Sequence, residues 1–305
     1  MNRRRLILTT GLLYLGLGTQ LRAQASTDML QRAIVHADGH PLHVWFKRPP
    51  NPRGTILLVH GRTWSSLPNF DLHVGRRSVS VMDRFVGRGY AVYALDMRGY
   101  GATPRDASGW LTPTRAASDV AAVLAWIGQK EPRLSKPVLV GYSRGAVVSL
   151  LVAQLYPATL SALVLYGMGY DAGAKLQPPL EPMQPPRQPT TAAAAASDFI
   201  TPTATPPDVV RAYVERALLS DPVRADWRRE QEFWAIDPVQ VATPTLLLHG
   251  VRDNYVRMDA QGRLFSTLAT ESKAWVVLPG VDHVAHVETA QAQWIDAILD
   301  FVEPH

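Results

Sequence analysis

The residues with the clearest chemical potential form the five-residue motif GYSRG at positions 141–145. It lies between an apolar stretch at 137–140, typical of a buried strand, and a stretch at 146–155 with helical spacing of apolar residues. Glycines on both sides let the strand and the helix approach closely, and the sharp turn leaves the serine hydroxyl exposed above the sheet. The motif alone is weak, but this context predicts that Ser143 is a nucleophile.

Two later residues, Asp253 and His283, are expected to complete a catalytic triad with Ser143. A serine hydroxyl needs a base to remove its proton, and a histidine oriented by a carboxylate supplies one. Asp253 follows the apolar stretch 245–249 in the sequence LLLHGVRDNYV, and His283 follows the stretch 274–278 in LPGVDHVAHVE. The order Ser143, Asp253, His283 is that of enzymes that carry their nucleophile on such a turn.

Both partners of the serine have rivals in the sequence. His286 is a second candidate base, but the position of His283 directly after the loop, next to Asp282, favours His283. Asp171 is a second candidate acid, and Asp253 alternatively is a simple loop aspartate.

The turn HGRTW at 60–64 provides a fourth catalytic element. It follows a predicted strand at 54–60. The backbone N–H of Arg62, together with that of Arg144, is placed to stabilise the oxyanion that forms when a carbonyl is attacked.

The elements that position these residues alternate between strands and helices. This alternation predicts an α/β fold, with a mostly parallel sheet and helices on both faces. Strands are expected at 31–46 (two strands joined by the turn Asp38-Gly39), 54–60, 91–96, 137–140, 161–166, 245–249 and 274–278, and helices at 78–87, 113–126, 146–155 and 288–301.

The alternation is interrupted between residues 168 and 235. This segment contains a stretch rich in Pro and Gln at 177–189, an alanine run at 192–196, and two predicted helices entered at Pro206-Pro207 and Asp221-Pro222. Because the pattern of buried strands then resumes, we interpret 168–235 as an insertion over the sheet. A disordered linker between two domains is the alternative.

Residues 1–25 are predicted to be a signal peptide. They combine a basic start (MNRRR), an apolar stretch at 6–21 and an Ala-x-Ala cleavage site at 23–25. An uncleaved membrane anchor is the alternative, and the glycines in the apolar stretch disfavour it. We expect an exported protein, periplasmic or secreted, without stable membrane insertion after cleavage.

Charge and composition exclude several classes of function. The leader's four arginines account for most of the formal charge of +5, which leaves +1 for the rest and gives no reason to expect a nucleic-acid partner. The absence of cysteine excludes disulfides, a thiol nucleophile and cysteine-bound metal. His36, His40 and His43 straddle a hairpin turn without a second cluster, so no metal site is expected.

The stretches LLVHGRTW, ALDMRGYG, GYSRG, HGVRD and GVDHVAHVE resemble those of α/β-hydrolase-fold serine hydrolases, in the order of that family. The resemblance covers the chain beyond the leader. It implies Ser143 as nucleophile, Asp253 as acid, His283 as base, and Arg62 and Arg144 as oxyanion donors. It also implies a hydrolase core at 26–167 and 236–305, interrupted by a cap at 168–235.

We therefore expect a cofactor-independent carboxylic ester hydrolase that acts on a small-molecule ester. Three aromatic residues, Trp64, Phe233 and Trp234, are candidates for lining the acyl or alcohol pocket. Peptide hydrolysis of the proline aminopeptidase kind, or carbon–carbon bond hydrolysis, is the alternative on the same triad. A binding protein without chemistry is disfavoured by the complete triad.

Arginine at both 62 and 144 departs from the family, in which these positions are more usually neutral. One interpretation is that the guanidinium groups bind an anionic carboxylate of the substrate. The other, which we favour, is that they pair with acids of the protein, as Arg144 would with Asp96 or Asp253.

Overall fold

A computed structural model of the protein describes residues 29–75, 77–171 and 181–303. The predicted signal peptide, residues 1–25, lies outside this range. Within the described part of the chain, every helix is too short or too polar to cross a bilayer.

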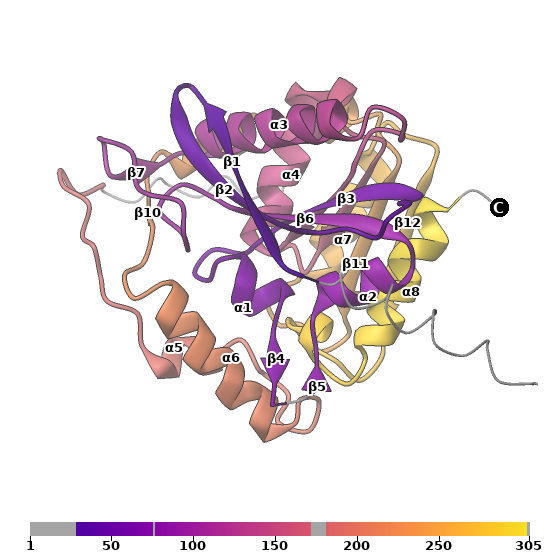
Figure 1. Cartoon of the computed structure of the whole chain (residues 1–305). Coiled ribbons are helices and arrows are strands. Elements are labelled where there is room, and N and C mark those ends of the chain that lie inside the picture. Colours follow the sequence, from indigo (N-terminus) through magenta and orange to yellow (C-terminus); the bar gives the residue numbers. More distant parts are fainter. Residues whose placement is uncertain (1–28, 76, 172–180, 304–305) are drawn as a thin grey trace, which may run out of the picture.

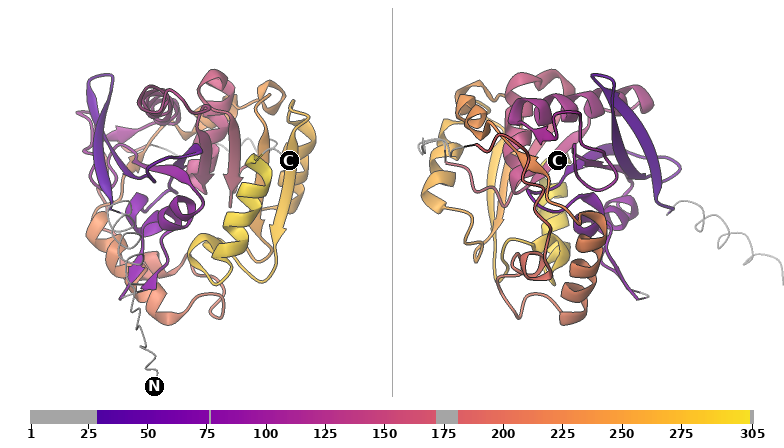
Figure 2. Two further views of the ribbon diagram at one scale, coloured as in Figure 1. Left: turned by 45° about the vertical axis from the view of Figure 1, so that its right-hand side comes forward. Right: turned by 90° about the vertical axis from the view of Figure 1, so that its left-hand side faces the viewer.

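The centre of the fold is one eight-stranded sheet (Figure 1). Its strands, in the order of their positions across the sheet, are β1 (Gln31–Ala37), β2 (His40–Lys47), β6 (Tyr90–Asp96), β3 (Gly54–Val59), β8 (Val138–Tyr142), β9 (Ala162–Tyr166), β11 (Thr245–Gly250) and β12 (Lys273–Leu278). The first two strands form an antiparallel hairpin that pairs antiparallel with β6, and all other neighbours are parallel. Figure 2 shows this hairpin at one edge of the sheet and β12 at the other.

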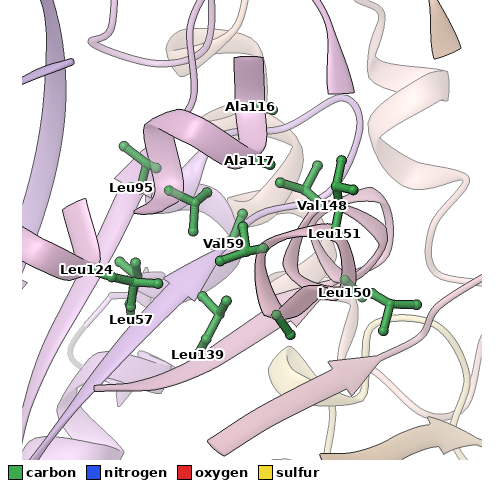
Figure 3. Packing of buried hydrophobic residues seen from close by; sticks show 14 of the residues in the cluster. Leu57, Val59, Leu95, Ala116, Ala117, Leu124, Leu139, Val148, Leu150 and Leu151 are labelled. Atoms are coloured by element: carbon green, nitrogen blue, oxygen red, sulfur yellow. The ribbon is translucent and has the colours of Figure 1, made fainter. Parts of the chain in front are cut away.

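Helices cover both faces of the sheet. Those of the α/β core are α1 (Ser66–Phe70), α2 (Val81–Gly87), α3 (Pro113–Lys130), α4 (Arg144–Leu155), α7 (Met258–Thr267) and α8 (Gln291–Val302). Buried side chains of α3, α4 and α7 pack on one face, and those of α2 and α8 pack on the other. Figure 3 shows the first of these layers, in which leucines and valines of the central strands meet small and aliphatic residues of α3 and α4. The predicted α/β fold class is confirmed.

The insertion segment, of which residues 168–171 and 181–235 are described, lies outside these two layers. Its helices α5 (Ala192–Ala196) and α6 (Pro207–Ser220) pack together, and α6 contacts α1 and the short strand β4 (His73–Val74), which pairs with β5 (Arg77–Ser78) (Figure 1). The alanine run therefore forms a helix, begun by the Thr191 side chain, which accepts the Ala194 N–H.

The prediction of a second helix in the insertion segment, after Asp221-Pro222, is wrong. The chain instead forms the short strand β10 (Asp226–Trp227), which pairs parallel with β7 (Trp110–Leu111), and then the 3-10 helix η3 (Glu230–Ala235). A long-range pairing has replaced the local helical preference, as tertiary contacts commonly do in short segments.

Gly145 allows α4 to approach β3 closely. A Cβ at this position would lie well inside van der Waals contact with the carbonyl oxygens of Val59 and His60. Gly145→Ala is expected to lower the free energy of unfolding by about 3 kcal/mol, because backbone rather than side chain must move. Urea unfolding followed by circular dichroism measures this change.

The matched control is Gly128→Ala, at an exposed position near the end of α3 with open space where a Cβ would be. Alanine is the better helix former, so this variant should gain about 0.5–1 kcal/mol. If Gly145→Ala is as stable as the wild type, the close approach of helix and strand has been misjudged.

Candidate active site

Ser143 lies at the turn between β8 and α4 in a conformation that residues other than glycine rarely adopt. Its φ is +53° and its ψ is −117°. The Ser143 N–H donates to the carbonyl oxygen of Tyr166 at the end of β9, at 2.8 Å, which fixes the turn to the sheet. Such backbone strain costs on the order of 1–3 kcal/mol and persists at functional sites when the surrounding structure enforces it. The predicted strand–turn–helix geometry is present.

His283 and Asp253 form a buried pair at the same edge of the sheet. The distance from His283 Nδ1 to Asp253 Oδ2 is 2.8 Å. Asp253 Oδ1 also accepts the Tyr255 N–H at 3.0 Å, so the carboxylate is held from both sides. Gly167 follows Tyr166, whose carbonyl oxygen accepts the Ser143 N–H, and a Cβ at Gly167 would lie 3.1 Å from His283 Nδ1 and 3.3 Å from Asp253 Oδ2. The structure thus brings the three predicted triad residues to one place.

The rival residues have other surroundings. The ring of His286 is fully buried against Tyr142, Tyr166 and Trp294, and burial lowers its pKa to about 3. Asp171 pairs with Arg263 at 3.0 Å on the outer side of α7. Neither forms a histidine–carboxylate pair like that of His283 and Asp253.

The loop of Arg62 is held by two buried side chains. His60 Nε2 accepts the Met97 N–H at 3.1 Å, so Nδ1 carries the proton and donates to the Gly61 carbonyl at 2.9 Å. Burial lowers the pKa of His60 to about 4, which keeps the ring neutral. The Tyr100 hydroxyl donates to the Arg62 carbonyl oxygen. These bonds orient the peptide groups on both sides of the Arg62 N–H.

The guanidinium groups of Arg62 and Arg144 converge on Glu230, in η3 of the insertion segment. Arg62 makes a bidentate contact with the carboxylate, at 2.6 and 2.7 Å. Arg144 Nη2 lies 2.9 Å from Glu230 Oε2, and its guanidinium carbon lies 5.2 Å from the ring centroid of Phe233. Burial acts to raise the pKa of Glu230, but the two guanidiniums outweigh it and hold the pKa below its usual value. The expectation that Arg144 pairs with Asp96 or Asp253 was wrong, because the partner comes from the insertion.

The three aromatic residues predicted to line a pocket differ in exposure. Trp64 is buried in a small cluster with α6, which attaches the insertion segment to the loop after β3. Phe233 is also buried and lies beneath the Arg144 guanidinium. Trp234 is 40% exposed on the outside of η3.

Sequence reasoning missed Asp198, a carboxylate that the insertion segment brings to the site. The pKa of Asp198 is raised, because the effect of burial exceeds the opposing effects of the neighbouring His283 and of a hydrogen bond from Trp64. The next residue, Phe199, packs edge to face on Tyr213 of α6, and Thr201 donates its N–H to Asp282 beside His283. These contacts place Asp198 between α6 and the histidine loop. No local motif marks this residue, since only the fold of the insertion brings it there.

Behind His283, two acids share a buried position. Glu288 Oε2 accepts the Asp282 N–H at 3.3 Å, and Glu288 Oε1 lies 3.3 Å from Thr205 Oγ1 of the insertion segment. Burial and the charge of Asp282 raise the pKa of Glu288 to about 8. Glu288 is therefore protonated at neutral pH.

This raised pKa makes a prediction about stability. The folded protein binds a proton at Glu288 that the unfolded chain releases near its ordinary pKa of 4.5, so this contribution is complete below pH 4.5 and disappears as pH rises through about 8. Glu288→Gln should therefore flatten the fall of the melting temperature between pH 5 and 8. Glu271→Gln, on an exposed turn, is the control. Parallel curves for Glu288→Gln and wild type would contradict the assignment.

A group of side chains of metal-ligating type, Asp71, His73 and Asp83, lies beside Lys47 of β2. The Lys47 ammonium already donates to Asp71 at 2.6 Å and to Asp83 at 2.5 Å and is almost fully buried. The lysine supplies the positive charge that these acids need. We therefore interpret the group as an internal ion pair.

Comparisons with known proteins identify the family. A sequence profile of the family described as Serine aminopeptidase, S33 matches residues 50–290. The monoacylglycerol lipase of Mycolicibacterium smegmatis is 27% identical over 288 residues, which cover 84% of this chain and 90% of that protein.

Solved structures show the same fold. A thermophilic esterase from Thermogutta terrifontis matches with a TM-score of 0.65 and 18% identity, over 89% of this chain and 98% of that one. A serine hydrolase involved in carbazole degradation matches with a TM-score of 0.64 and 18% identity, over 90% and 99%. The expected resemblance is confirmed: the chain belongs to the serine aminopeptidase (S33) family of α/β-hydrolase-fold hydrolases.

Proposed function

We propose that this protein is a carboxylic ester hydrolase that works through an acyl-enzyme on Ser143. The observation that carries the proposal is the strained turn at Ser143 beside the His283–Asp253 pair, whose atoms are 2.8 Å apart. The relative named monoacylglycerol lipase supports ester over amide as the scissile bond.

The proposed reaction has two halves. His283 removes the Ser143 proton as the oxygen attacks the ester carbonyl, and the backbone N–H groups of Arg62 and Arg144 stabilise the oxyanion. His283 then gives the proton to the leaving alcohol. Water, deprotonated by the same histidine, releases the acid and restores the serine. Asp253 keeps Nδ1 protonated, so that Nε2 is free to act as the base.

A substrate panel tests the proposal. It contains p-nitrophenyl esters of increasing acyl length, a monoacylglycerol, and aminoacyl p-nitroanilides. The ester hydrolase is expected to turn over one of the esters faster than every anilide. Faster cleavage of an anilide would replace this proposal with peptide hydrolysis.

An aminopeptidase is the second candidate, and Asp198 is the observation that favours it. A peptidase that acts at a free amino terminus needs an acid for the substrate ammonium, and the Asp198 carboxylate lies near His283. In that case Asp198→Asn would slow the anilides while leaving neutral esters unchanged. Equal effects on both substrate classes would remove this candidate.

Two further proposals concern the rest of the chain. The insertion segment acts as a cap, because α6 and η3 contact the loops that carry Trp64 and Arg62. The protein is exported, with cleavage after Ala25, so the N-terminal sequence of the mature form should begin at Ser26. Recovery of the uncleaved chain from the cytosol would contradict export.

A further inference from the structure

The part of the insertion segment that follows α6 contacts the loop of Arg62 at several points. Asp221, at the end of α6, accepts the N–H and the hydroxyl of Ser65, both at 2.8 Å, and the Gly101 N–H at 2.8 Å. The Trp227 indole N–H donates to the Tyr100 hydroxyl at 2.7 Å, and that hydroxyl donates to the Arg62 carbonyl. The insertion thus helps to determine the conformation of the loop.

Glu230 extends this contact to the side chains of both proposed oxyanion donors. It accepts two hydrogen bonds from Arg62, and the Arg144 guanidinium lies against the same carboxylate. Arg62 lies in the loop after β3, and Arg144 directly follows Ser143. One carboxylate therefore links the side chains of the two proposed oxyanion donors, in addition to the direct pairing of β3 with β8 in the core.

The geometry also bears on what the arginines do. The bidentate face of Arg62 is occupied by Glu230, and only 38% of the Arg62 side chain and 25% of the Arg144 side chain are exposed. A substrate carboxylate would have to displace Glu230 to make this bidentate contact with Arg62. Partly buried bidentate pairs fix direction as well as distance, so this contact is suited to positioning the backbone.

We propose that Glu230 is a positioning residue, which orients the Arg62 and Arg144 N–H groups toward the oxyanion through the two arginine side chains. The inference rests on the proposed acyl-enzyme mechanism. Glu230 does not touch substrate. Its effect is that the insertion segment takes part in catalysis, in addition to any selection of substrate.

Glu230→Gln tests this inference, with Glu232→Gln as the matched control. Glu232 lies in the same 3-10 helix, but its carboxylate accepts the Thr114 N–H at the start of α3 and pairs with Arg229. Loss of one oxyanion donor costs about 100–1,000-fold in kcat. We expect the misorientation in Glu230→Gln to lower kcat on a neutral ester by about 10–100-fold and to change KM by less than about twofold.

A second readout separates positioning from a loss of structure. A trifluoromethyl ketone forms a tetrahedral adduct whose oxyanion occupies the site between the two N–H groups. Its inhibition constant should rise for Glu230→Gln by the same factor as kcat falls, and should stay unchanged for Glu232→Gln. Thermal melting checks that both variants are folded. If Glu230→Gln does not fold, Arg62→Lys keeps the charge, loses the bidentate contact and should lower kcat by about tenfold.

Three outcomes would overturn the inference. The first is an unchanged kcat in folded Glu230→Gln, and the second is an equal loss in Glu232→Gln. The third is an unchanged kcat on the neutral ester with a gain only on a matched monoacid ester, which would make the arginines an anion-binding site. Failure of wild-type Ser143 to react with a fluorophosphonate would instead contradict the proposed function itself.

Discussion

Ser143→Ala is expected to lower ester turnover by roughly a million-fold, the largest effect of any single substitution in this chain. The alanine keeps the Cβ and therefore the strained turn at φ +53°, but it removes the oxygen that forms the acyl-enzyme. Triad residues act as a unit, so His283 and the oxyanion donors cannot replace the nucleophile. Steady-state kinetics on the best ester of the panel measures the loss.

A fluorophosphonate probe with peptide mass spectrometry identifies the reactive residue independently of the substrate. The wild type should carry one adduct, on the peptide that contains Ser143, and the alanine variant should carry none there. Ser161→Ala, at an exposed position before β9, is the control and should retain full activity. An adduct on a different serine, or full turnover by Ser143→Ala, would show that the nucleophile lies elsewhere.

The central strands were predictable because strands buried on both faces appear in the sequence as continuous apolar runs. The strand predicted at 161–166 is β9 (Ala162–Tyr166), and that predicted at 245–249 is β11 (Thr245–Gly250). The turn at Ser143 was predictable for a different reason, since both of its glycines lie at close backbone contacts. A Cβ at Gly145 would meet the carbonyl oxygens of Val59 and His60, and a Cβ at Gly141 would meet the start of α4.

The insertion segment was much less predictable. The parallel contact between β10 and β7 joins residues more than a hundred positions apart, and a two-residue strand has no periodicity of its own.

Helix α7 (Met258–Thr267), in the core after the insertion segment, was missed because Gly262 interrupts a short and mostly polar stretch.

The partner of the two arginines was unpredictable for the same physical reason. Glu230 is separated from Arg62 by 168 residues. Its η3 helix contains a second acid, Glu232, with a similar local sequence environment. Only the path of the chain through β10 decides which of the two carboxylates pairs with Arg62 and Arg144. A long-range ion pair of this kind depends on the fold of the whole insertion, which local patterns do not report.

Asp253→Asn is expected to lower kcat by about ten thousand-fold while leaving the protein folded. His283 Nδ1–H donates a hydrogen bond to Asp253 Oδ2, at 2.8 Å, which keeps the proton on Nδ1 and leaves Nε2 able to act as the base. The asparagine amide in the same place donates to Nδ1, so the proton moves to Nε2 and the histidine can no longer accept the Ser143 proton. The loss should therefore appear in kcat, with KM and the melting temperature nearly unchanged. Asp171→Asn, at the rival acid that pairs with Arg263, is the matched control and should retain activity within about twofold. If Asp171→Asn suffers the large loss and Asp253→Asn does not, the acid of the triad has been assigned to the wrong loop.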